Sequence, residues 1–183
     1  MGSSAWQLTG RYHADPNQSL RDVQHTYFAE HYNLGELIPD VLADSRQCVA
    51  AVQDDDEYGL LETYTRTLEA VERLASLPIP PDIDSQIQML RDFVYATGEP
   101  LENILDFIGV ATASGIKFVA PLTDDQLMHL FGTSRPTAET VGDFDSQEAY
   151  TMIGRGHAVC FSLFSDSEPK EPVGIIFAGY TVD

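Results

Sequence analysis

The stretch AVCFSLFSDSEPKEPVGIIFAGY, residues 158–180, decides the fold of this chain. Two apolar runs, Ala158–Phe164 and Val173–Tyr180, flank a polar loop, Ser165–Pro172, which contains charged residues and two prolines. Short apolar runs on either side of a loop rich in turn-forming residues are typical of a β-hairpin. We therefore expect two paired strands in this part of the chain.

Two other segments have the character of strands. Ala5–His13 places its large apolar side chains at mostly alternate positions and ends before the turn-forming pair Asp15-Pro16. Ile116–Ala120 is short and apolar. Together with the hairpin, these segments predict a small, mostly antiparallel sheet.

Between the predicted strands, apolar residues recur three and four positions apart, as they do on the buried face of a helix. The clearest case is Glu36–Val52, where the apolar residues form one stripe and the acidic residues lie off it. The last helix of the series begins with Pro100, a residue that fits the first turn of a helix. The predicted helices pass through residues 20–28, 36–52, 61–74, 83–94 and 100–108.

A short helix is expected after the third strand segment. Thr123 is followed three residues later by Gln126, which is the spacing of a capping box. Gly132 is a natural end for this helix.

These segments predict an α+β fold. A helix-rich central block of about five helices is expected to pack on one face of a small, mostly antiparallel sheet formed by the N-terminal strand and the C-terminal strands. The alternative is an all-helical bundle with an appended hairpin. With 183 residues, the chain is expected to form a single domain over residues 1–183.

The negative charge of the chain is concentrated in the helical block. Glu36–Asp106 holds 16 Asp and Glu but only four Arg, so it carries a net charge of −12 out of the −19 of the whole chain. Such a surface repels nucleic-acid phosphates and anionic membranes and attracts basic partners. We therefore expect a basic protein surface as partner, with no direct nucleic-acid binding and no membrane binding. Adaptation to high salt is the alternative explanation of this charge.

Four consecutive acids are the candidate contact for a basic partner, and they are Asp54, Asp55, Asp56 and Glu57. The run lies between two predicted helices with acidic outer faces. It lacks the alternating ligand spacing and the glycine of a helix-loop-helix calcium site, so recognition of a partner is favoured over calcium binding.

No catalytic or cofactor motif is present, so neither a cofactor nor a metal is expected. His13-Ala14-Asp15 has the His-x-Asp spacing of a facial iron triad, but the helical segments around it do not fit the double-sheet barrel of those enzymes. Cys48 and Cys160 both fall within apolar patterns and are expected to be inert core thiols. The lack of a long apolar run or a leader pattern makes the cytoplasm the expected location.

Two classes of function remain open, and the oligomeric state is undetermined. The favoured class is a small acidic binding protein that caps or inhibits a basic partner, as immunity proteins or nucleic-acid mimics do. The alternative is a metal-independent enzyme or ligand-binding domain with a pocket between helices and sheet. Aromatic residues and one histidine would line that pocket, namely Trp6, Tyr12, Tyr27, Phe28 and His129.

Overall fold

The computed structural model describes residues 5–53, 58–98, 101, 103–112, 115, 117–142 and 157–180. It divides into two compact units, here called the sheet unit (residues 1–27 and 102–183) and the helical unit (residues 28–101). The boundary between them falls inside helix α1 (Pro16–His31). A single domain requires that the two units unfold together in one cooperative transition. The single domain over residues 1–183 therefore stays a prediction.

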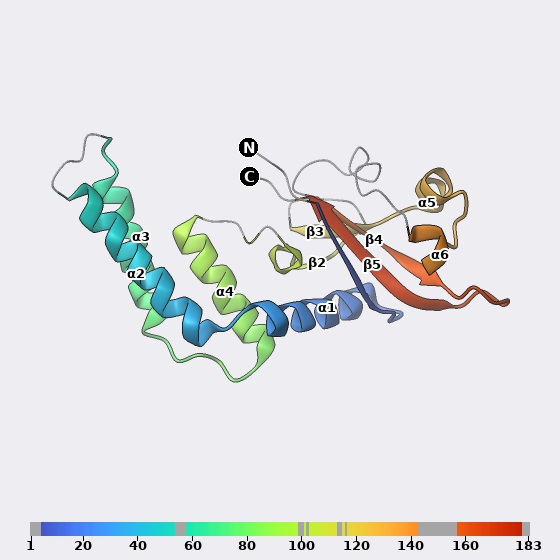
Figure 1. The fold of residues 1–183 in the computed structure, drawn as a ribbon, viewed down its shortest axis with the longest axis horizontal. Coiled ribbons are helices and arrows are strands. Elements are labelled where there is room, and N and C mark those ends of the chain that lie inside the picture. The colour runs from blue at the N-terminus through green and yellow to red at the C-terminus, as the bar shows by residue number, and fades with distance from the viewer. Residues whose placement is uncertain are drawn as a thin grey trace. The chain divides into compact units, whose positions relative to one another are not determined.

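The sheet unit has the strand order β1-β5-β4-β3-β2 among its described strands (Figure 1). The strands are β1 (Ala5–Arg11), β2 (Gly109–Val110), β3 (Phe118–Pro121), β4 (Ala158–Phe164) and β5 (Pro172–Tyr180). The long pairings of β5 with β1 and with β4 are antiparallel, and the short pairings of β3 with β4 and with β2 are parallel. The α+β class, the hairpin and the placement of the N-terminal strand beside it are confirmed, in a sheet that is mixed.

A tryptophan and a glycine fix the pairing of β1 with β5. Trp6 lies directly opposite Gly179, and a Cβ atom on that glycine would come within 2.3 Å of the indole atom Cζ2. The glycine therefore makes room for the ring. The indole also contacts Phe107, with ring centroids 5.7 Å apart.

Helices cover both faces of the sheet. On one face, Val23 of α1 fills the space above Gly10, where an added Cβ atom would approach the Val23 methyl Cγ2 to 2.3 Å. On the other face, α5 (Asp124–Phe131) and α6 (Ala138–Val141) pack on Phe161 and Ile176. The expectation of helices on one face is wrong because the connection from β3 to the parallel strand β4 carries α5 and α6 to the face opposite α1.

The segment before β2 is a single 3₁₀ turn, η1 (Ile104–Asp106), and the helix predicted through residues 100–108 is wrong over its described residues. Asn103 Oδ1 accepts the backbone N–H of Leu105 at 2.8 Å. Gln24 Nε2 donates to the carbonyls of Ile104 and Phe107 at 2.9 and 2.7 Å. These bonds satisfy backbone groups that a longer helix would have paired internally.

The helical unit contains α2 (Leu34–Val52), α3 (Leu61–Ala75) and α4 (Ile83–Thr97), as predicted. α3 packs against both α2 and α4. Asp82 caps α4 by accepting the backbone N–H of Ser85 at 2.9 Å, and this bond lowers the pKa of the Asp82 carboxyl. Within the described part of the chain, no helix is both long and apolar enough to cross a membrane.

Candidate functional site

Three acids form a line along the first half of α2, here called the acidic stripe: Glu36, Asp40 and Asp44. They are four residues apart, which places them on one side of the helix. All three are exposed, and no described cation pairs with them. Two other acids of the unit are paired with arginines, Glu72 with Arg46 at 3.0 Å and Glu62 with Arg66. The stripe is therefore open to an outside cation.

The predicted contact residues Asp54, Asp55, Asp56 and Glu57 lie outside the described residues. In the sequence they begin two positions after Val52, the last residue of α2, and α2 has no basic residue in its last turn.

A cavity of about 470 Å³ lies inside the helical unit, and we call it the three-helix cavity. Side chains of α2, α3 and α4 line it, together with Tyr32 and Leu101. Most of the lining is apolar or aromatic, and among the described lining residues Asp44 is the one that carries a charge. The end of the acidic stripe is thus also part of the wall of an apolar cavity.

The two cysteines have different surroundings. Cys160 is buried in β4, as predicted, and burial raises the pKa of its thiol to about 12. Cys48 is exposed and lines the three-helix cavity, so the prediction of a buried core thiol is wrong at this position. The apolar stripe of α2 faces a cavity here, not close-packed neighbours.

We expect Cys48 and Cys160 to react at very different rates with a disulfide reagent such as DTNB at pH 8. Cys48 is accessible, whereas Cys160 is buried and almost entirely protonated at this pH. The native protein should show one fast thiol and one that reacts at least about 100-fold more slowly, and both should react in denaturant. Cys48→Ser should abolish the fast phase. Two fast thiols in the native protein would contradict the structure.

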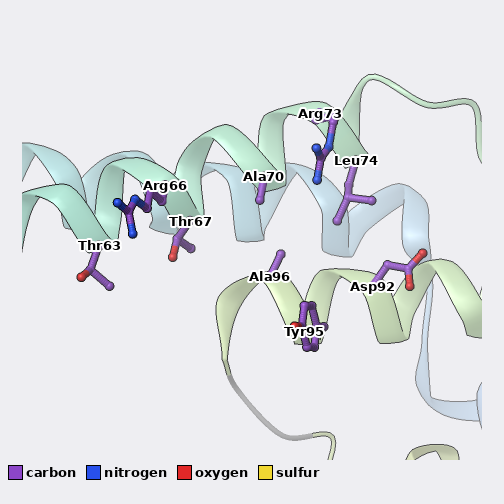
Figure 2. Close-up of a pocket in the computed structure, with 9 residues that line it drawn as sticks. All are labelled: Thr63, Arg66, Thr67, Ala70, Arg73, Leu74, Asp92, Tyr95 and Ala96. Atoms are coloured by element: carbon purple, nitrogen blue, oxygen red, sulfur yellow. The ribbon is translucent and has the colours of Figure 1, made fainter.

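A second cavity of the helical unit, about 540 Å³, lies between α3 and α4 (Figure 2). It shares Thr63 and Thr67 with the three-helix cavity. Its charged lining mixes both signs, with Arg66 and Arg73 from α3 and Asp92 from α4. This cavity is consequently a poorer match to a basic partner than the three-helix cavity.

The sheet unit has its own cavity of about 270 Å³, here called the sheet-edge cavity. It lies where β1, β3 and β4 end, and residues Tyr12 and His13 after β1 are in its wall. The imidazole Nε2 of His13 is 2.6 Å from Asp22 Oδ2. Nothing in the sequence pointed to this pair, since its members lie on different elements on either side of a turn.

The five residues of the alternative pocket have different environments. Tyr12 is the one that lines the sheet-edge cavity. The others are packed or exposed elsewhere: Trp6 contacts Phe107, Tyr27 is half-buried on α1, Phe28 stacks on Tyr32 in the helical unit, and His129 is exposed on α5.

The His-x-Asp motif is divided between two local contacts. His13 bonds to Asp22, whereas Asp15 Oδ1 accepts the backbone N–H of Asn17 at 2.9 Å at the start of α1. No group of three or more His, Cys, Asp or Glu side chains among the described residues is placed to hold a metal ion.

Comparison of this chain with protein-family models, with curated proteins and with solved structures gives no match.

Proposed function

We propose that this protein binds a basic partner protein through its helical unit and thereby caps or inhibits it. The observation that carries the proposal is the acidic stripe of α2, which is exposed, has no described cation partner and ends in the wall of the three-helix cavity. Exposed charge of one sign accelerates the approach of a partner of the opposite sign, and apolar contact then prolongs the complex.

The chemistry of the site specifies the partner further. Cationic side chains spaced by one helical turn would match Glu36, Asp40 and Asp44. An apolar side chain from the same segment would enter the cavity, against residues such as Leu37, Val41 and Phe93. The segment that fits is therefore a basic amphipathic helix.

Asp54, Asp55, Asp56 and Glu57 add four charges shortly after the end of the same helix. Their proposed role is to extend the attractive field for the basic partner. Because four consecutive like charges repel one another, neutralising them should not lower the stability of the protein.

A designed 18-residue Leu/Lys amphipathic helix is expected to bind the protein at low salt and to protect Cys48 from DTNB. The row of lysines on the peptide should pair with the acidic stripe, while its leucines fill the three-helix cavity, which Cys48 lines. A Leu/Glu peptide of the same pattern and a lysine homopolymer serve as comparisons. Fluorescence anisotropy reports affinity and the rate of thiol release reports occupancy of the cavity.

The Leu/Glu peptide should not bind, and the lysine homopolymer should bind without protecting Cys48. Equal binding of the two amphipathic peptides would show that charge does not select the partner. Binding of the Leu/Lys peptide with no change in Cys48 reactivity would remove the three-helix cavity from the contact.

A further inference from the structure

The sheet-edge cavity combines features of a small-ligand site that the proposed partner binding does not use. It lies at the C-terminal ends of β1 and β3 and along the second half of β4, and these three strands run in the same direction. The ends of such strands are a common location for ligand sites in sheets that carry helices on both faces. A volume of about 270 Å³ has room for a ligand of roughly ten non-hydrogen atoms or fewer.

His13 is held in place at both its backbone and its side chain. Its backbone N–H donates to the hydroxyl of Ser19, which is completely buried, at 2.9 Å. Its imidazole Nε2 lies 2.6 Å from Asp22 Oδ2. An ionised carboxylate accepts hydrogen bonds and does not donate them, so Nε2 carries the proton in this contact.

The other ring nitrogen of His13, Nδ1, is an acceptor in the tautomer that carries its proton on Nε2. Among the described residues no hydrogen bond to Nδ1 is found, and His13 is one of the residues that line the cavity. Only 18% of this side chain is exposed. A ligand with an N–H or O–H donor can therefore bond to a pre-oriented acceptor.

Charge determines which kind of donor the cavity favours. Asp124, in the first turn of α5, is among the lining residues, whereas neither Lys nor Arg is. Arg135 follows the lining residue Ser134, and its guanidinium carbon lies 5.8 Å from the centroid of the Phe164 ring, so this ring already has a cation partner. The net charge of −19 also raises the local concentration of cations.

Aromatic rings complete the lining. Tyr12, Phe161 and Phe164 are all among the lining residues. The Phe161 ring packs on Phe131, with centroids 5.2 Å apart, and Arg135 lies over the Phe164 ring, so Tyr12 supplies the ring for a bound cation. The faces of such rings attract ammonium groups, and their apolar surface accepts a short aliphatic chain. Acceptor, carboxylate and rings thus converge on one ligand chemistry.

We infer that the sheet-edge cavity binds a small primary amine in its ammonium form. The ammonium group bonds to Asp124 and to His13 Nδ1, and the alkyl part lies against the aromatic rings. This site belongs to the sheet unit and is independent of the basic partner proposed for the helical unit.

The test is a titration of the full chain with three molecules of one size, butylammonium, butanol and butyrate, at pH 7.5, followed by ¹H–¹⁵N NMR of the backbone and of the histidine rings. Butylammonium should shift the His13 ring and the Tyr12 and Phe161 amides in a saturable manner. Butanol and butyrate should bind at least about tenfold more weakly, because they lack the cation.

Asp124→Asn should weaken butylammonium binding at least about fivefold, whereas Asp125→Asn should change it less than about twofold. Both residues lie in the first turn of α5 and are exposed, but only Asp124 lines the cavity, so the pair controls for helix stability and for net charge. The weakest affinity expected is on the order of millimolar, so the titration runs to about 50 mM ligand. The inference is overturned if no saturable shift appears at the cavity over this range. It is also overturned if the three molecules bind with equal affinity or if the two variants have equal effects.

Discussion

Replacing Gln24 with leucine is expected to lower the free energy of unfolding by about 2–4 kcal/mol. Gln24 is buried on α1, and its amide nitrogen donates to two backbone carbonyls, those of Ile104 and Phe107. Leucine has a similar volume but no donor. It would leave the two carbonyls without this bond in a region from which water is excluded.

Urea unfolding followed by circular dichroism gives the free energy, and Gln18→Leu is the matched control. Gln18 lies on the same helix but is exposed, so its replacement should change the free energy by less than about 0.5 kcal/mol. The amides of η1, which the Gln24 contacts hold, should also exchange faster with solvent in Gln24→Leu. Equal stability of the two variants would mean that water replaces the Gln24 amide at no cost.

Local signals predicted most of the secondary structure correctly. The capping box at Thr123 is present, with the Thr123 hydroxyl accepting the Gln126 N–H and the Gln126 side chain accepting the Thr123 N–H. The C-terminal hairpin follows equally from the alternation of short apolar runs with a polar loop. Such features depend on residues within a few positions of one another, so one sequence is enough to detect them.

Features that depend on distant residues were not predicted. The apolar pattern after Pro100 is compatible with a helix, but the groups that hold η1 include Gln24, 80 residues away from Ile104. The coverage of both sheet faces likewise depends on the parallel pairing of β3 with β4. No residue pattern within either strand distinguishes a parallel pairing from an antiparallel one.

The candidate sites illustrate the same limit. Leu37 and Val41 belong to the apolar stripe predicted for α2, but such a stripe does not show whether its side chains meet close-packed neighbours or a cavity. Cys48 was misassigned for that reason. The His13–Asp22 pair has no signature because a turn separates its members. The charge of the helical unit, in contrast, was evident from composition.

Neutralising the acidic stripe with Glu36→Gln, Asp40→Asn and Asp44→Asn is expected to slow association with the Leu/Lys peptide about tenfold at low salt. The same variant should show a flatter dependence of the association rate on salt, since fewer charges contribute to the attraction. Stability should fall by about 0.5 kcal/mol, because Glu36 lies in the first turn of α2, where a negative charge is favourable. Stopped-flow fluorescence at several salt concentrations measures the rates.

A variant with the same net charge separates the stripe from the overall field of the protein. Asp125→Asn, Glu139→Gln and Asp166→Asn remove three exposed acids from the sheet unit. If the stripe is the contact, this control should slow association no more than about twofold, because it removes the same net charge but none of the charges proposed to pair with the peptide. Adding Asn at positions 54–56 and Gln at position 57 to the stripe variant should slow association further. Equal rates for the two triple variants would mean that net charge alone attracts the peptide, and the acidic stripe would then be a solvated helix face with no part in recognition.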